Sequence, residues 1–167
     1  MLYLHTSALL RRARGEKFEC DDELDTILVE AALGGRRIWM SSLVFAELTP
    51  SAFTAGAFAN VDDFARHLHS LAVFVSPDPN IMLRAARLRD FQWRRPSPPR
   101  QPGDHARFMP LSDAIQIASA LWVKEVVNVP NLEFLAIDAG SKDDEAGRTL
   151  CSCASRTTST IRRRTPT

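Results

Sequence analysis

The chain has 167 residues, of which 45 % are hydrophobic, and its formal net charge is +1. This length and composition predict one domain with a substantial apolar core. No stretch approaches the roughly 18 apolar residues of a membrane span, the N-terminus lacks the long apolar stretch of a signal peptide, and three cysteines do not make a disulfide framework, so we expect a cytoplasmic protein without a membrane partner.

The first two-thirds of the chain alternates short apolar segments with segments of helical periodicity. Ser7 is the expected cap of the first helix, Ser41 or Ser42 of the third, and Asp78 of the fifth, with Asp62 and Asp63 opening the fourth. The expected strands are 2–4, 36–40 and 72–75, and the expected helices are 7–14, 21–31, 41–48 with a resumption at 51–55, 62–71 and 79–91.

The last third begins with a loop, because "RRPSPPRQPGDHARF" contains several prolines. The apolar segment "PLSDAIQIASALWVKEVV" predicts a helix over 110–127, and a last strand is expected at 134–137. We expect one domain over 1–147, including a Pro/Arg-rich loop at 94–107, followed by a basic, disordered tail at 148–167.

Short strands that are apolar on both faces and alternate with helices indicate a mainly parallel sheet covered on two sides. The predicted fold class is therefore α/β, a three-layer α/β/α sandwich with a short central sheet. In such sheets functional groups gather beyond the carboxyl ends of the strands.

The charge is unevenly distributed along the chain. Residues 94–107 carry four Arg and one Asp, and residues 148–167 carry five Arg and no acid, which leaves 12 basic and 19 acidic residues elsewhere. An acidic body disfavours a broad DNA-binding face, whereas basic appendages can still attract phosphate at long range.

Four chemistry-bearing side chains fall at predicted strand ends or in the first turns of the helices that follow: His5, Glu47, Asp113 and Asp138. Each also has a purely structural interpretation, since Asp113 with Ser112 can cap a helix, Asp138 can open a turn and Glu47 can point to solvent. Carboxylates gathered at one sheet edge repel one another unless a cation lies among them, and hard oxygen ligands suit Mg²⁺ or Mn²⁺.

Four short motifs resemble those of PIN-domain ribonucleases, the group that contains the VapC-type toxins of bacterial toxin–antitoxin pairs. "LYLHTSALL" is similar to the first motif, "SSLVFAEL" to the second, "PLSDAIQIASAL" to the third and "LEFLAIDAG" to the fourth. The resemblance covers roughly residues 1–140 and departs from the family at position 5, where the family has Asp and this chain has His5. It implies a PIN-like fold.

The resemblance implies a metal-dependent endoribonuclease that cleaves single-stranded RNA with Mg²⁺ or Mn²⁺ held by Glu47, Asp113, Asp138 and the residue at position 5. Thr6 and Ser7 would place a hydroxyl and a helix N-terminus near the phosphate. It also implies an antitoxin partner and a homodimer. Arg residues of the loop could steer RNA, whereas Trp39, Trp93 and Trp122 are too scattered in sequence to predict a base-stacking platform.

His5 has three competing interpretations. It can bind a softer metal such as Mn²⁺, it can be protonated and supply the positive charge that the metal normally provides, or it can be a packed residue without a role. The second is the favoured expectation and predicts an impaired nuclease. The alternative function is a catalytically inactive PIN-like domain that binds RNA or an antitoxin.

Overall fold

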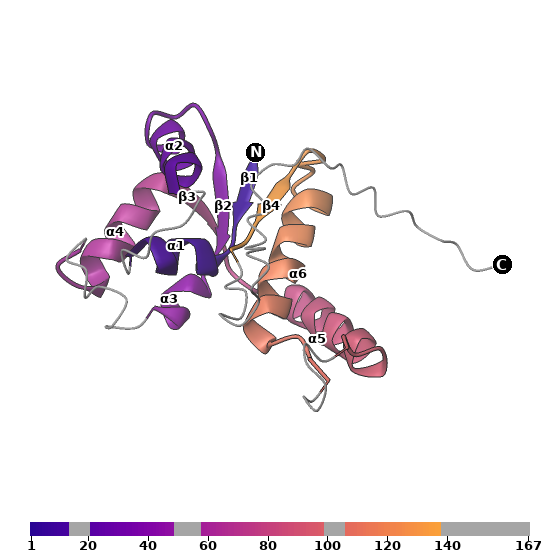
Figure 1. Cartoon of the computed structure of the whole chain (residues 1–167). Helices are drawn as coiled ribbons and strands as arrows, with labels where there is room; N and C mark the ends of the chain where they lie inside the picture. The colour runs from indigo at the N-terminus through magenta and orange to yellow at the C-terminus, as the bar shows by residue number, and fades with distance from the viewer. Residues whose placement is uncertain (14–20, 49–57, 99–105, 138–167) are drawn as a thin grey trace.

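The computed structural model describes residues 1–13, 21–48, 58–98 and 106–137, and these form one four-stranded sheet with helices on both faces (Figure 1). The strands are paired in the order β3-β2-β1-β4, and all three pairings are parallel. Their bounds are β1 (Leu2–Leu4), β2 (Ile38–Ser41), β3 (Ala72–Val75) and β4 (Glu133–Leu135).

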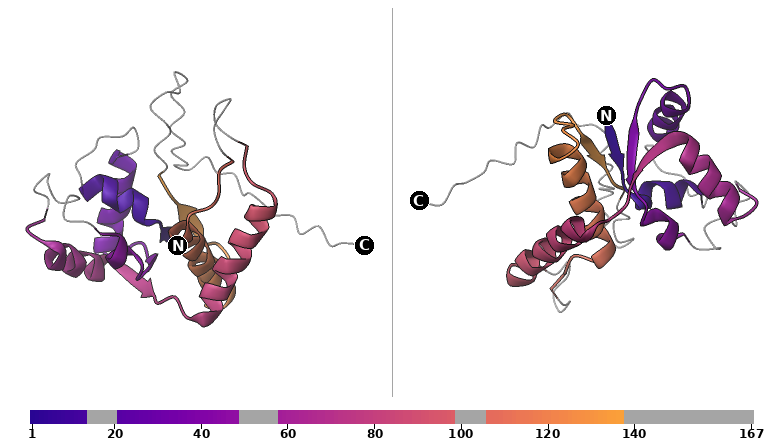
Figure 2. Two further views of the ribbon diagram at one scale, coloured as in Figure 1. Left: turned by 90° about the horizontal axis from the view of Figure 1, so that it is seen from below. Right: turned by 180° about the vertical axis from the view of Figure 1, so that it is seen from behind.

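The helices of the described part divide into two groups, one on each face of the sheet (Figures 1 and 2). Helices α1 to α4 cover one face, and α5 and α6 pack on the other. Their bounds are α1 (Thr6–Ala13), α2 (Asp21–Ala32), α3 (Val44–Glu47), α4 (Val61–Leu71), α5 (Pro79–Arg94) and α6 (Leu111–Glu125). The expected α/β class with a parallel, two-sided sheet is confirmed, while the PIN-like detail stays a prediction.

The central strand β1 shows why the sequence must be apolar on both faces. Leu2 and Leu4 point into the core under α1 to α4, and Tyr3 points into the core under α5 and α6. Successive side chains of a strand alternate between faces, so a strand covered on both sides buries every residue. All three residues of β1 are at most 3 % exposed.

Helices α5 and α4 both begin at a side-chain N-cap, of which the sequence predicted the first correctly and placed the second two residues late. Asp78 caps α5 as predicted, because its Oδ1 accepts a hydrogen bond from the backbone N–H of Ile81 at 2.8 Å. Helix α4 is capped by Asn60 instead of opening at Asp62, since Asn60 Oδ1 accepts from the N–H of Asp63 at 2.8 Å. Asp62 and Asp63 lie in the first turn, where they complement the helix dipole.

Two other caps differ from the prediction. Helix α3 has Leu43 at its N-cap without a side-chain hydrogen bond, and Ser41 Oγ accepts from the N–H of Leu43 in the turn before the helix. Helix α6 has Pro110 at its N-cap and likewise no side-chain cap. The first-turn residue Asp113 is therefore free of the capping role that a purely structural interpretation would give it.

The predicted elements that fall within the described residues all exist, and their bounds shift by a few residues. Strand β2 begins at Ile38 and β4 ends at Leu135, while α5 extends to Arg94 into the expected loop. The bounds move because helix and strand ends depend on local hydrogen bonds that periodicity does not encode. The resumed helix at 51–55, the middle of the Pro/Arg-rich loop, Asp138 and the tail 148–167 lie outside the described residues.

Within the described ranges, none of the helices is both long enough and apolar enough to cross a bilayer.

Helix α5 offers a matched test of which side chains hold the fold. Ile81 is 1 % exposed and Leu83 is 52 % exposed on the same helix. Ile81→Ala should lower the free energy of unfolding by about 2–5 kcal/mol, because it leaves a cavity in the core. Leu83→Ala should change it by less than about 0.5 kcal/mol. Urea denaturation followed by circular dichroism measures both, and equal effects would contradict this packing.

Candidate functional site

The candidate site lies at the carboxyl edge of the sheet, beside its central strand. From β1 the chain passes to β2 on one side, whereas β4 pairs on the other side of β1. A parallel sheet whose connections diverge in this way opens a crevice at the strand ends, where side chains from several loops meet. His5 follows β1 directly at this point, and its backbone N–H donates to Leu135 O at 2.9 Å.

His5 is the N-cap of α1, in place of the Ser7 expected from the sequence. The backbone N–H of Ser7, the second residue of the helix, donates to His5 Nδ1 at 3.1 Å. The hydroxyl of Ser7 also lies 3.0 Å from Nδ1. Imidazole thus takes the place of the oxygen acceptor that an Asp or Asn would supply at a helix N-cap.

This cap determines which ring nitrogen of His5 carries the proton. A backbone N–H can only donate, so Nδ1 must present its lone pair, and in the neutral ring the proton then lies on Nε2. Nε2 faces Asp113 Oδ1 at 3.4 Å. Nδ1 thus acts as the acceptor of the Ser7 N–H, and the expectation that His5 is an imidazolium stays a prediction.

Asp113 reaches the site from the first turn of α6, which packs on the opposite face of the sheet from α1. Its side chain is 44 % exposed, whereas that of His5 is 12 % exposed. The ring of Phe134 on β4 lies edge-on to His5, with centroids 5.9 Å apart, and limits its contact with water. The pair is therefore a half-buried N–H donor facing a carboxylate that is open to solvent.

Gln116, one turn after Asp113, connects Glu47 to the same site. Its amide Nε2 donates to Glu47 Oε2 at 3.1 Å and to Thr6 Oγ1, while its Oε1 accepts from the Tyr3 hydroxyl at 3.1 Å. Gln116 and Thr6 are each 1 % exposed, and Tyr3 is fully buried. One side chain thus joins β1, α1, α3 and α6 at the sheet edge.

Sequence reasoning missed Gln116, although a signal was present. "PLSDAIQIASAL" is an apolar helix in which Gln116 is polar and lies three residues after Asp113, on the same helical face. A buried amide in such a helix needs partners for both its donors and its acceptor. That requirement could have indicated a polar network, though not which residues complete it.

Tyr3 carries the one clear pKa shift of the network. Burial raises the pKa of its hydroxyl far above the usual value near 10, and the negative charge of Glu47 adds to this rise. The neighbouring hydroxyls of Ser119 and Ser41 act in the opposite direction. Tyr3 therefore stays neutral and donates to Gln116 throughout the range of ordinary buffers.

Ser7 links the end of β1 to the segment that follows β4. Its Oγ accepts from the backbone N–H of Ile137 at 3.1 Å while it lies beside His5 Nδ1. Ile137, which is 2 % exposed, is the chain neighbour of Asp138, and Asp138 itself lies outside the described residues. The hydroxyl of Ser7 is therefore committed to internal contacts.

The structure brings five of the six predicted site residues to one edge of the sheet: His5, Thr6, Ser7, Glu47 and Asp113. Thr6 differs from its expected role, because its buried hydroxyl bonds to Gln116 and cannot face a phosphate. Glu47 and Asp113 keep exposed area, so these two carboxylates are the groups of the described site that can meet a ligand.

The described residues do not by themselves fit a divalent cation. His5 turns an N–H, not a lone pair, toward Asp113, and Glu47 Oε2 already accepts from Gln116. In the described ranges no three His, Cys, Asp or Glu side chains lie close enough to hold a metal ion. The expected ligand set of Glu47, Asp113, Asp138 and His5 thus depends on Asp138 and on the residue at position 5.

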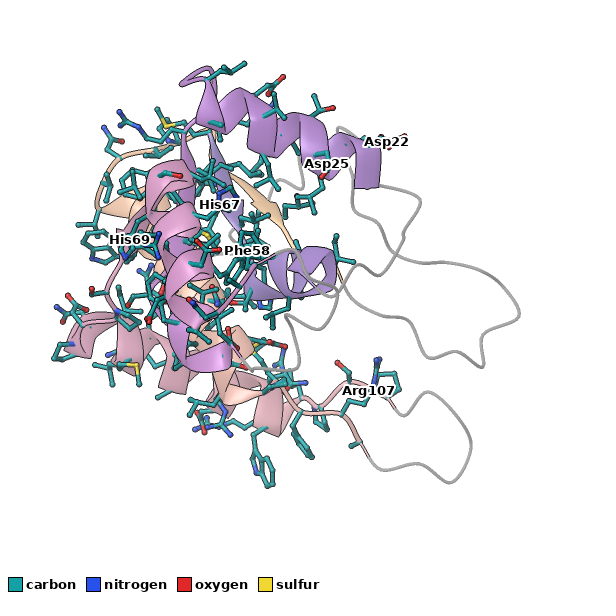
Figure 3. All side chains as sticks on the ribbon, turned by 90° about the vertical axis from the view of Figure 1, so that its left-hand side faces the viewer. Asp22, Asp25, Phe58, His67, His69 and Arg107 are labelled. Atoms are coloured by element: carbon teal, nitrogen blue, oxygen red, sulfur yellow. The ribbon has the colours of Figure 1, made fainter. Side chains whose placement is uncertain are left out.

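The two histidines of α4, His67 and His69, which Figure 3 labels, take part in contacts with aromatic rings. His67 lies 5.3 Å from the Phe58 ring, and His69 packs between Phe45 and Phe74 at 5.3 and 4.8 Å. Their neighbours are aromatic, which fits packing better than metal binding.

Comparisons of the chain with protein-family models, with curated proteins and with solved structures found no match. The site must therefore be judged on its own geometry.

Replacing Gln116 tests whether its network acts as a unit. Gln116→Met keeps the size of the side chain but removes the amide partner of Tyr3, Thr6 and Glu47, and we expect a loss of about 2–4 kcal/mol in the free energy of unfolding. Tyr3→Phe alone should cost about 1 kcal/mol. The double variant should lose less than the sum in urea denaturation, because both changes remove the same hydrogen bond. Additive losses would show that the two side chains do not interact.

Tyr3 also predicts a pH dependence of stability. A group whose pKa is raised by folding contributes stability below its unfolded pKa, about 10, and that contribution falls as the pH rises further, by up to about 1.4 kcal/mol per pH unit. The stability advantage of the unmodified chain over Tyr3→Phe should therefore shrink between about pH 9 and about pH 11. Urea denaturation at each pH measures this advantage.

The absorbance of the folded chain provides an independent check, because Tyr3 is the only tyrosine of the chain. The tyrosinate signal should stay absent near pH 10 for as long as the chain is folded. A tyrosinate signal that rises near pH 10 without unfolding would contradict the burial of this hydroxyl.

Proposed function

We propose that this chain is a metal-dependent endoribonuclease of the PIN type, acting on single-stranded RNA, whose catalysis is impaired by His5. The observation that carries the proposal is the convergence of His5, Asp113 and Glu47 at the carboxyl edge of β1, from three segments far apart in sequence. The four motifs that resemble PIN-domain ribonucleases place their first three acidic positions at these residues.

The impairment follows from the chemistry of position 5. An Asp at an N-cap accepts the same hydrogen bond from Ser7 N–H and adds a negative charge that faces Asp113. The imidazole of His5 accepts that hydrogen bond but directs an N–H toward the carboxylate. Position 5 thus keeps its structural role, and the site loses one of the hard oxygen ligands that Mg²⁺ or Mn²⁺ prefers.

The second candidate function is a PIN-like domain that binds RNA or an antitoxin without cleaving. The 3.4 Å contact between His5 Nε2 and Asp113 Oδ1 favours it, because a ring nitrogen occupies the surroundings of the carboxylate where a cation would lie. The antitoxin partner, the toxin role and a homodimer depend on the resemblance alone. Loss of growth on expression of the His5→Asp chain, relieved by a co-expressed neighbouring gene product, would support them.

Restoring the carboxylate at position 5 tests the proposal. His5→Asp should bind Mn²⁺ measurably by calorimetry and cleave single-stranded RNA at least about 100-fold faster than the unmodified chain in Mn²⁺ or Mg²⁺, since general catalytic groups of this kind contribute roughly 10²–10⁴-fold. His5→Asn is the matched control, because its amide caps α1 equally well and brings no charge.

Two results would decide against a nuclease. If His5→Asp and His5→Asn behave alike in both Mn²⁺ binding and RNA cleavage, position 5 does not belong to a metal site. If cleavage by His5→Asp survives Asp113→Asn in the same chain, then cleavage comes from elsewhere or from a contaminant. RNA binding by the unmodified chain without any gain of cleavage in His5→Asp would favour the second candidate function.

A further inference from the structure

An exposed pair of aromatic rings lies at the end of α5, outside the site described above. The rings of Trp93 and Phe108 stack with centroids 4.4 Å apart and an interplanar angle of 28°. Trp93 is 67 % exposed and Phe108 is 43 % exposed. Exposed apolar patches often mark binding sites, so this pair of rings is a candidate surface for binding a ligand.

The side chain of Gln92 positions Phe108 in this stack by hydrogen-bonding to the backbone on either side of it. Its Nε2 donates to Arg107 O at 2.8 Å, and its Oε1 accepts from the N–H of Met109. These two contacts bracket Phe108, and an antiparallel bridge between Ser97 and Arg107 holds the same segment. Phe108 is therefore fixed against Trp93 by hydrogen bonds, and the surface is organised before any ligand arrives.

A hollow accompanies the stack. It has a volume of about 240 Å³ and is lined by Arg89, Asp90, Gln92, Trp93, Phe108 and Met109. This volume lies below the roughly 300–1,000 Å³ of sites for drug-sized ligands. A hollow of that size, with one aromatic wall and polar groups opposite, suits a single planar ring system.

The surroundings of the stack are basic. Arg89 lines the hollow, and Arg107 is the chain neighbour of Phe108. The nearby acid Asp90 is paired with Arg94 at 2.8 Å, so it cancels one of the positive charges and no more. Figure 3 shows Arg107 on the segment that leads into α6, at the opposite end of the molecule from Asp22 and Asp25 of α2.

We propose that Trp93 and Phe108 form a base-stacking platform for single-stranded RNA, with Arg89 binding a phosphate beside it. Any nucleobase can stack on an aromatic ring, and proteins commonly bind single-stranded nucleic acid with arginines next to such rings. Positive charge around the rings favours RNA over a protein partner or a second copy of this chain. The substrate class rests on the proposed function.

The platform is close enough to the candidate site to serve one substrate. Phe108 precedes Asp113 by five residues, which span at most about 18 Å even when fully extended. Met109 and Pro110 connect the two directly, and Pro110 is the N-cap of α6. A strand stacked on the platform could therefore run a few nucleotides to the carboxylates at the sheet edge.

Binding in the absence of metal separates this proposal from catalysis. We expect a short fluorescein-labelled oligouridylate to bind the full chain in EDTA, as followed by fluorescence anisotropy. Trp93→Ala and Phe108→Ala should each raise Kd about 5- to 100-fold, whereas Trp93→Phe, which keeps a stacking face, should stay within about threefold. Arg89→Ala should reduce the dependence of log Kd on log salt by about one.

Leu83→Ala is the control, because Leu83 is exposed on the same helix and carries no ring. Its Kd should equal that of the unmodified chain, and circular dichroism should show all variants folded. Absence of oligouridylate binding, or equal binding by Trp93→Ala, would overturn the platform. If Trp93→Ala instead turns a dimer into a monomer in sedimentation and leaves RNA binding unchanged, the rings form an interface between copies and the proposal is also overturned.

The two proposals fail in different ways. Trp93-dependent binding of the oligouridylate without cleavage by His5→Asp would contradict the nuclease and leave the platform intact. Cleavage by His5→Asp that Trp93→Ala does not slow, at oligouridylate concentrations below Kd, would contradict the platform and leave the nuclease intact.

Discussion

The amide of Gln116 is the constraint on which the candidate site depends. It is buried in an otherwise apolar helix, and it bonds at once to Tyr3 of β1, Thr6 of α1 and Glu47 of α3. A rotation or shift of α6 would leave several buried polar atoms without partners, at a cost of about 1–3 kcal/mol for each atom. Because side chains three residues apart share a helical face, fixing Gln116 also directs Asp113 toward His5.

The fold was predictable because its causes are local and periodic. Alternating apolar segments gave the parallel sheet and its two helical layers, and Asp78 before Pro79 gave the start of α5. Convergence of His5, Glu47 and Asp113 was also predictable, since parallel strands end at one edge. The partners within the site were not, because the Gln116 network joins positions up to 113 residues apart and no periodicity encodes such a contact. The same holds for Trp93 and Phe108, which look unrelated in sequence.

His5 shows how one position can serve the fold and the site separately. The fold needs an acceptor for the N–H of Ser7, and either imidazole Nδ1 or a carboxylate oxygen provides one. A metal site of the proposed kind would need a negative charge facing Asp113, which imidazole does not provide. A change between Asp and His at such a position therefore leaves α1 capped and alters only the charge. A well-formed site edge is no evidence that position 5 is catalytically competent.

Charge explains why binding and cleavage would be separable on this molecule. Glu47 and Asp113 repel the phosphates of an approaching strand, whereas the arginines around Trp93 and Phe108 attract them. At ordinary ionic strength such attraction reaches only about 8–10 Å, so each region acts mainly on the nucleotides next to it. An RNA strand bound to the basic platform could therefore extend to the acidic edge despite the repulsion there. A cation would be needed only at that edge, to offset the charge of the carboxylates. Because His5 brings no negative charge to that edge, repulsion of phosphate there is weaker than it would be with an Asp at position 5. If the proposed function holds, the absence of an Asp at position 5 would both impair cleavage and, on the same physical grounds, favour retention of RNA without metal.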